Sequence, residues 1–162
     1  MLIIIIFAIV VFGIFIYTWC QFRSSLKPQK PPKKSVLNKN LKIIKKFLIT
    51  SDGIKISSWY IPVKNSKAII ILIHGYRQIN EDKSRLLTHA TYLNKAGYST
   101  VLIDLRSFGE SEGNKIFLGT REWKDAEAVY DYVKLLPENK GKKIGFYGKS
   151  MGGVTSLITK AI

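Results

Sequence analysis

The segment Gly148-Lys149-Ser150-Met151-Gly152 places a serine between two glycines at a spacing suited to nucleophilic chemistry. It follows the apolar segment 143–147 and precedes 152–161, which has helical character. In such a strand-to-helix turn the serine hydroxyl is lifted out of the sheet, and the first N–H groups of the helix point toward developing negative charge. The glycines allow neighbouring segments to approach closely. The pattern predicts a nucleophile elbow that presents the Ser150 hydroxyl. The alternative, an ordinary glycine-rich or phosphate-binding turn, lacks the spacing of a P-loop or dinucleotide fingerprint.

Two further loops also follow short apolar segments. His74-Gly75-Tyr76 comes after 68–73, and the loop 104–113 comes after 100–103. Parallel α/β sheets place their functional sites at the carboxyl ends of strands. We therefore expect both loops to lie at the same edge of a sheet as Ser150.

The elements that would position these loops alternate between strand and helix. Two β-rich segments, 41–50 and 54–61, flank the turn signal Ser51-Asp52-Gly53 and predict an antiparallel hairpin. Continuous apolar runs predict buried strands, and 3.6-residue periodicity predicts helices. The strands are 68–73, 100–103 and 143–147, and the helices are 82–96, 120–136 and 152–161. This order predicts an α/β fold, a mostly parallel sheet with crossover helices.

Composition excludes several classes of protein. The chain has 162 residues, 46% hydrophobic and 23% charged, which fits one folded domain. Its single cysteine excludes a disulfide framework, and no Cys/His cluster has metal-ligand spacing, so we predict no metal and no cofactor. The net charge is +15, but the excess lies mainly between Arg23 and Lys46, before the first acid, Asp52. Such confinement argues against nucleic acid as a partner.

The N-terminus predicts a membrane anchor. Residues 2–19 are almost purely apolar and as a helix would reach about 27 Å, close to the hydrocarbon core of a bilayer. A cleavable signal peptide is the alternative, but no cation precedes the run and no small-residue cleavage site follows it. We predict a transmembrane anchor over 1–22, a basic Pro/Lys-rich linker over 23–40 and a domain over 41–162. The cations after the anchor predict that the domain faces the cytoplasm and that the lipid bilayer is a partner.

These motifs resemble those of the α/β-hydrolase superfamily, particularly its membrane-anchored bacterial serine hydrolases. His74-Gly75 ends the first buried strand as the His-Gly motif of that family does. The segment Asp104-x-Arg106-x-x-Gly109-x-Ser111-x-Gly113 is similar to the loop after its next strand, although Ser107 stands where many members have glycine. The segment 148–152 resembles the nucleophile elbow.

The resemblance implies a role for each matching residue. Ser150 would be the nucleophile that forms an acyl-enzyme with an ester, amide or thioester of a small-molecule, acyl or peptide substrate. The backbone N–H groups of Met151 and Tyr76 would form the oxyanion hole. The remaining motif residues would be structural, namely His74, Gly75, Asp104, Arg106, Gly109, Gly148 and Gly152. We expect His89 on the surface or in helix packing, and Asp125 and Glu127 to be solvated or to cap their helix.

One part of the family pattern is missing. The triad of this fold follows the order Ser, Asp or Glu, His, and residues 151–162 contain none of these acids and no histidine. We therefore expect the N-terminal half of a hydrolase, ending in an exposed edge strand and without the triad Asp and His. A separately encoded C-terminal half is one partner that could complete it. The alternative is a non-catalytic remnant that serves as a membrane-attached binding or scaffold module.

Overall fold

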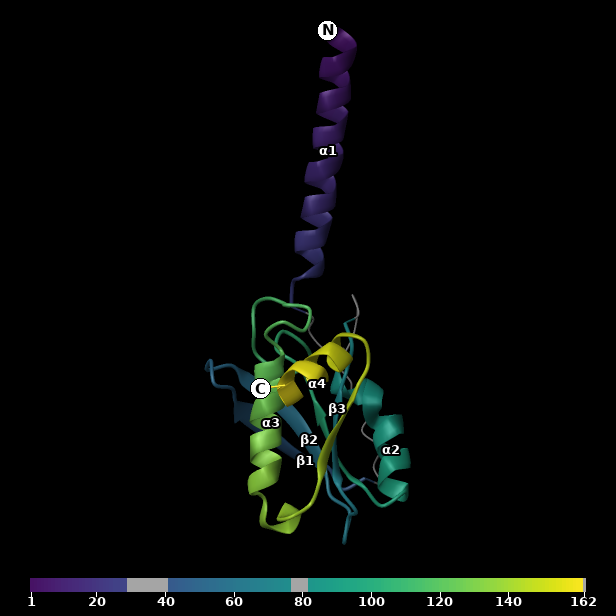
Figure 1. Ribbon diagram of the computed structural model, residues 1–162, viewed down its shortest axis with the longest axis vertical. Helices are drawn as coiled ribbons and strands as arrows, with labels where there is room; N and C mark the ends of the chain where they lie inside the picture. The colour runs from purple at the N-terminus through teal and green to yellow at the C-terminus, as the bar shows by residue number, and fades with distance from the viewer. Residues whose placement is uncertain (29–40, 77–81, 162) are drawn as a thin grey trace.

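A five-stranded mixed sheet forms the centre of the domain in the computed structural model, which describes residues 1–28, 41–76 and 82–161 (Figure 1). The strands are β1 (Ile44–Ile49), β2 (Lys55–Ile61), β3 (Ile69–Ile73), β4 (Ser99–Ile103) and β5 (Ile144–Gly148), in the spatial order β1-β2-β4-β3-β5. The first two pairs in this order are antiparallel, and β4, β3 and β5 run parallel. The structure thus confirms the predicted α/β class.

The predicted hairpin is present, and its turn has a clear local cause. Thr50 Oγ1 accepts a hydrogen bond of 2.9 Å from the Ile54 N–H and donates one of 2.6 Å to Asp52. Gly53 has a φ of 82°, in the left-handed region that glycine adopts without steric cost. The turn sets the register in which Ile49 faces Lys55.

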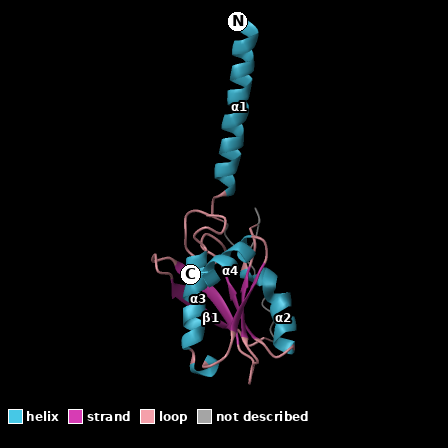
Figure 2. Ribbon diagram, viewed as in Figure 1, coloured by secondary structure: helices cyan, strands magenta, loops and turns pink. Residues whose placement is uncertain are grey.

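Helices cover both faces of the sheet (Figure 2). Helix α2 (Leu87–Lys95) packs on one face, where Leu86 and Ala90 join an apolar cluster with Trp59, Leu72 and Leu102. Helices α3 (Trp123–Leu135) and α4 (Met151–Ala161) lie on the other face (Figure 1). The larger apolar cluster beneath them combines alternate strand residues with helix residues, including Ile71, Ile103, Ala126, Val129, Val133 and Met151.

Two predicted helices begin later than their periodicity suggested. The segment predicted as the start of a helix at residue 82 forms a 3-10 turn over Lys83–Leu86, because the Asp82 carboxylate accepts the Ser84 N–H at 2.8 Å and caps a tight first turn. Helix α3 begins at Trp123 because the residues before it form an irregular loop, with positive φ at Leu118 and Gly119. A second short 3-10 turn, Pro137–Asn139, follows α3.

Strand β5 corrects one prediction and confirms another. We predicted a fully buried strand, but Tyr147 is 39% exposed and most of the strand is only half-buried. The reason is that β5 pairs with β3 on one side and lies at the edge of the sheet within the described residues. The expected exposed edge strand is present.

The N-terminal helix α1 (Leu2–Ser25) extends away from the domain, and none of its side chains is buried against the domain (Figure 1). It has 24 residues, or about 36 Å, and is apolar enough to cross a membrane or to be a signal sequence. It continues three residues beyond the predicted anchor, through Arg23. Its end is tied to the domain by hydrogen bonds from the Tyr76 hydroxyl to Ser25 O, at 2.8 Å, and from the Ile116 N–H to Leu26 O, at 3.0 Å. The predicted linker lies largely in 29–40, outside the described residues.

Candidate active site

Ser150 occupies a sharp turn between β5 and α4. Its φ is +51°, a left-handed conformation that is uncommon for a residue with a side chain, and its side chain is exposed. Within the described residues the Ser150 hydroxyl makes no hydrogen bond. The turn therefore holds a free hydroxyl in a strained backbone position at the carboxyl end of a strand.

The two glycines of the segment are required by close backbone contacts. A Cβ atom on Gly148 would lie 2.2 Å from Gly152 O, and one on Gly152 would lie 2.3 Å from Ile73 O and 2.5 Å from His74 O. These distances are far below van der Waals contact. Gly148 and Gly152 thus let the turn fold against itself and against the end of β3.

The start of α4 leaves one N–H group available next to Ser150. The Gly152 N–H donates to Lys149 O at 2.9 Å, and those of Gly153 and Val154 donate to Ser150 O at 2.8 and 3.2 Å. The first N–H groups of a helix have no partner inside it. In the part of the chain that the structure describes, the Met151 N–H has no acceptor.

The loop after β3 lies against the same turn. A Cβ atom on Gly75 would lie 2.9 Å from Lys149 O and 3.4 Å from the Cβ of Ser150. Tyr76 is the next residue along the chain. Its side chain has a separate contact, because its hydroxyl reaches Ser25 at the end of α1. Residues 77–81 lie outside the described part of the chain.

Neither histidine side chain forms a hydrogen bond with Ser150 within the described residues. His74 is fully buried and packs edge-on against Phe108, with ring centroids 4.9 Å apart. Its Nε2 accepts the Leu105 N–H at 3.2 Å, and its Nδ1 therefore donates to Gly75 O at 2.8 Å. Both ring nitrogens join the loops after β3 and β4. His89 is exposed, and its ring lies beside that of Tyr147.

Asp104 organises the loop after β4 through a buried ion pair. Its carboxylate accepts hydrogen bonds from the backbone N–H of Lys83, at 2.7 Å, from the Lys83 ammonium, and from the Glu110 N–H, at 2.9 Å. Asp104 is fully buried and Lys83 is 2% exposed. A Cβ on Gly109 would lie 2.2 Å from Asp104 Oδ2, so a glycine is needed there. The sequence carried no signal for Lys83, which lies 21 residues earlier.

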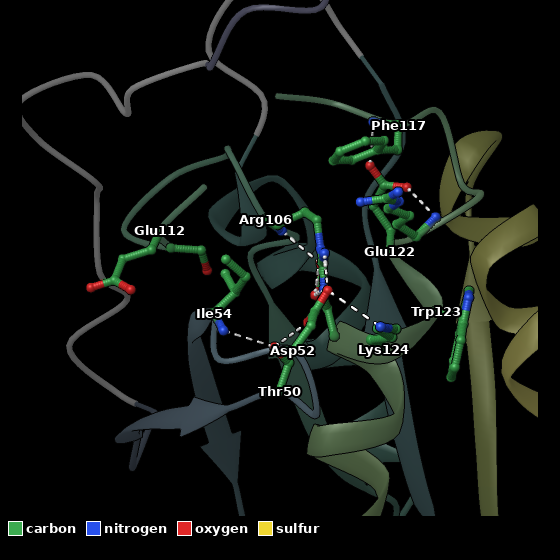
Figure 3. Close-up of polar contacts among 12 residues, drawn as sticks. Thr50, Asp52, Ile54, Arg106, Glu112, Phe117, Glu122, Trp123 and Lys124 are labelled. Atoms are coloured by element: carbon green, nitrogen blue, oxygen red, sulfur yellow. Dashed lines mark hydrogen bonds and ion pairs between the residues drawn. The ribbon is translucent and has the colours of Figure 1, made fainter. Parts of the chain in front are cut away.

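Arg106 joins three segments in a second network, in which Arg106 and Asp125 are buried and Asp52 is partly exposed (Figure 3). Its guanidinium donates to both Asp125 Oδ1 and the Asp52 carboxylate at 2.7–2.9 Å, and its backbone N–H donates to Asp125 Oδ2 at 2.8 Å. The hydrogen bonds from Arg106 hold the pKa of Asp52 well below its usual range. Burial raises the pKa of Asp125 to about 6, although its hydrogen bonds with Arg106 oppose the shift.

Asp125 corrects a second prediction. We expected a solvated or capping residue on its helix, but Asp125 is fully buried and paired with Arg106. The helical pattern placed it correctly on α3 but did not show that the loop after β4 covers that position.

Glu122 is a buried carboxylate that the sequence analysis did not identify. It is fully buried and accepts the N–H groups of Phe117 and Gly119 at 2.7 and 2.8 Å (Figure 3). These bonds shape the loop 114–121, which precedes α3 and lies against both Leu26 and α4. Its position directly before α3 did not indicate that it would be buried.

Removing the Arg106 side chain is expected to destabilise the domain strongly. Arg106→Ala leaves the buried Asp125 charge without its partner, and such losses cost about 3–5 kcal/mol. The cost should be smaller at pH 5 than at pH 8, because the raised pKa of Asp125 lets the folded state bind a proton as the pH falls. Chemical unfolding at the two pH values measures both effects.

The matched control for that experiment is Lys55→Ala. Lys55 pairs with Glu112 at 3.1 Å, but both side chains are about half exposed, so its loss should cost at most about 1 kcal/mol at either pH. Equal loss of unfolding free energy in the two variants would show that the Arg106 network stabilises the domain no more than an exposed ion pair does.

The structure brings the candidate residues to one edge of the sheet. Gly75 lies against the turn that holds Ser150 and Met151, whereas Asp104 and Arg106 lie in networks that support the neighbouring loop. Among the described residues, no group of three His, Cys, Asp or Glu side chains could hold a metal ion.

Sequence comparison places the chain among hydrolases. Residues 64–160 match the hydrolase family described as serine aminopeptidase, S33. The chain is 30% identical over 120 residues to the polyketide transferase ATR5 of Stachybotrys chlorohalonatus. This alignment covers 70% of this chain and 38% of that protein. It is 29% identical over 111 residues to YNL320W of Saccharomyces cerevisiae, named an uncharacterized membrane protein, with coverage of 68% and 37%.

Solved structures show the same fold. The esterase Pf2001 of Pyrococcus furiosus superposes with a TM-score of 0.65 and 26% identity, over 82% of this chain and 51% of the esterase. XC6422 of Xanthomonas campestris, described as a serine hydrolase without a lid, gives a TM-score of 0.62 at 21% identity, over 74% of this chain and 56% of that one. The chain spans about half the length of these two solved structures. It spans less than two fifths of the polyketide transferase and of the yeast membrane protein.

Proposed function

We propose that Ser150 is the nucleophile of a serine hydrolase, because this chain belongs to the serine aminopeptidase S33 family of α/β-hydrolases and holds that serine in an exposed, strained turn. The observation that carries the proposal is the geometry of this turn. Within the described residues the Ser150 hydroxyl makes no hydrogen bond and the Met151 N–H beside it has no acceptor, and the flanking glycines admit no side chain.

The proposed reaction is acyl transfer through a covalent intermediate. Ser150 Oγ attacks the carbonyl carbon and gives its proton to a base, while the carbonyl oxygen takes up negative charge near the Met151 and Tyr76 N–H groups. The bond from carbon to the leaving group then breaks, and the leaving group receives the proton. Water attacks the acyl-enzyme in the same way and releases the acid and a free Ser150.

The base is proposed to come from outside the described residues. Both ring nitrogens of His74 are engaged in loop contacts, and His89 lies on α2 with no hydrogen bond to Ser150 in the described structure. The triad order of this fold puts the acid and the histidine after the nucleophile. Since the esterase relative is about twice as long as the region it shares with this chain, we assign both partners to sequence equivalent to its second half.

The proposed substrate is an ester, amide or thioester. The printed descriptions of two relatives, an esterase and a polyketide transferase, both fit chemistry at an acyl carbon. The substrate binds at the carboxyl edge of the sheet, beside the Gly75 loop.

The proposed location is a membrane, with α1 as a single span and the domain in the cytoplasm. Support comes from the length and apolar composition of α1 and from the cations that follow it. A relative named as a membrane protein is in keeping with this placement.

A fluorophosphonate probe tests the proposal, because it reacts covalently with activated serines. The protein is expressed from its own complete gene, and its membranes are treated with the probe. We expect labelling of the wild type and none of Ser150→Ala, because alanine lacks the attacking oxygen.

Ser156→Ala is the matched control, since Ser156 lies on α4 six residues after Ser150 and its hydroxyl donates to Gly152 O, its one hydrogen bond among the described residues. It should label like the wild type. Equal labelling of Ser150→Ala would reject Ser150 as the nucleophile, and no labelling of any form would favour a non-catalytic membrane-attached binding module.

A further inference from the structure

The junction between α1 and the domain contains a groove with a volume of about 720 Å³. One wall is the last turns of α1 and the segment just after it, and the other is the start of the loop 114–121. Aromatic and aliphatic side chains and three cations line it, namely Trp19, Phe22, Leu26, Arg23, Lys27 and Lys115. None of the lining residues is acidic.

The groove combines an apolar side with unneutralised positive charge. Trp19 and Phe22 are about half exposed, with ring centroids 6.4 Å apart. Arg23, Lys27 and Lys115 are exposed and form no ion pair with any described residue. A ligand that fits carries a negative group beside an apolar chain.

The position of the groove along the axis of α1 indicates which kind of ligand would reach it. Phe22 lies 20 residues after Leu2, which in a helix corresponds to about 30 Å, the thickness of the hydrocarbon core. If α1 spans a bilayer from Leu2, the groove opens at the level of the lipid headgroups. Anionic lipids attract cations at this level, and aromatic rings favour it.

We propose that this groove binds the headgroup of an anionic phospholipid. The lipid phosphate lies among Arg23, Lys27 and Lys115, and the upper part of an acyl chain lies along Trp19 and Phe22. The proposal rests on the proposed membrane insertion of α1 and not on the chemistry of Ser150.

A bound lipid would also orient the candidate active site. The loop that forms one wall of the groove contacts the elbow helix, because a Cβ on Gly119 would lie 3.0 Å from Val154 Cγ1 and 3.7 Å from Met151 O. The other side of the groove is tied to the Gly75 loop through Tyr76 and Ser25. A lipid in the groove therefore holds the edge of the sheet that carries Ser150 toward the membrane surface.

Spin-labelled lipids in nanodiscs test the proposal. The intact protein is reconstituted in phosphatidylcholine with a trace of spin-labelled phosphatidylglycerol or spin-labelled phosphatidylcholine, and electron paramagnetic resonance gives the motionally restricted fraction of each. We expect a preference of at least about fivefold for phosphatidylglycerol, the effect of one cation near an anionic lipid. High salt should reduce this preference.

The test variant replaces all three cations, as Arg23→Gln, Lys27→Gln and Lys115→Gln. Their side chains make no hydrogen bond within the described structure, so folding should be preserved, and the preference should fall close to one. The matched control is Lys64→Gln, Lys67→Gln and Lys95→Gln, which removes the same charge from exposed positions at the opposite edge of the sheet. It should keep the wild-type preference, as should Ser150→Ala.

Each outcome decides between the parts of the account. The proposal that the groove binds an anionic lipid is rejected if the wild type restricts the two lipids equally. It is also rejected if the two triple variants lose the preference equally. Lys115→Gln alone provides a milder variant and should lower the preference in the same direction. Absence of restricted lipid of either kind contradicts the membrane insertion of α1, and with it this proposal, while leaving the role of Ser150 to the probe experiment.

Discussion

Ser150→Ala is expected to lower kcat for a short-chain aryl ester by about 10⁶-fold, as loss of the nucleophile does in a serine protease. The alanine side chain cannot form the acyl-enzyme, so only water attack assisted by the oxyanion N–H groups remains. The fold should not change, because the Ser150 hydroxyl makes no hydrogen bond within the described structure and its side chain is exposed. Steady-state kinetics of the intact protein and its variant measure the effect.

Thermal unfolding separates this chemical effect from misfolding. The midpoint of Ser150→Ala should match that of the wild type, and Ser156→Ala should retain turnover within a factor of a few. If Ser150→Ala kept turnover near the wild-type rate while folding normally, another group would have to attack the substrate.

Gly152→Ala is expected to disrupt the elbow and destabilise the domain by about 3 kcal/mol or more. The new Cβ would lie 2.3 Å from Ile73 O and 2.5 Å from His74 O, and both are backbone atoms at the end of β3. Neither can move without shifting the strand that carries the Gly75 loop. Labelling of Ser150 by a fluorophosphonate should be lost as well, because the turn cannot keep its shape.

Gly153→Ala, at the next position, is a close control. Its Cβ would meet Gly148 O at 3.4 Å, an ordinary contact, and alanine favours a helix over glycine by about 1 kcal/mol. The unfolding midpoint should therefore stay the same or rise, and labelling should persist. Similar losses in the two variants would mean that the close packing of Gly152 does not decide the stability of the elbow.

Local patterns were sufficient to predict the strands and the turn that holds Ser150. The apolar segments before His74, Asp104 and Gly148 each form a strand of the same sheet. The first two are runs of aliphatic residues, which a small domain buries in the middle of a parallel sheet. The glycines at 148 and 152 were recognisable because close backbone approach requires them and nothing else at that spacing explains them. The sequence therefore predicted the architecture and the position of Ser150 between a strand and a helix.

Partners that lie far apart in the chain could not be predicted in the same way. Lys83 pairs with Asp104, and Asp125 pairs with Arg106, across separations of 21 and 19 residues. Helical periodicity gives the face of a residue but not the loop that will cover it, so Asp125 was expected in solvent. The hydrogen bond from Tyr76 to Ser25 depends on how α1 meets the domain, which no local pattern encodes.

The most direct test of the central claim is to trap the acyl-enzyme. The intact protein is mixed with an aryl acetate, quenched in acid during turnover and digested, and the acetylated peptide is located by mass spectrometry. The account predicts one acetyl group on Ser150, absent from Ser150→Ala. An acetyl group on a different residue, or turnover of the ester with no acetyl group on Ser150, would contradict it.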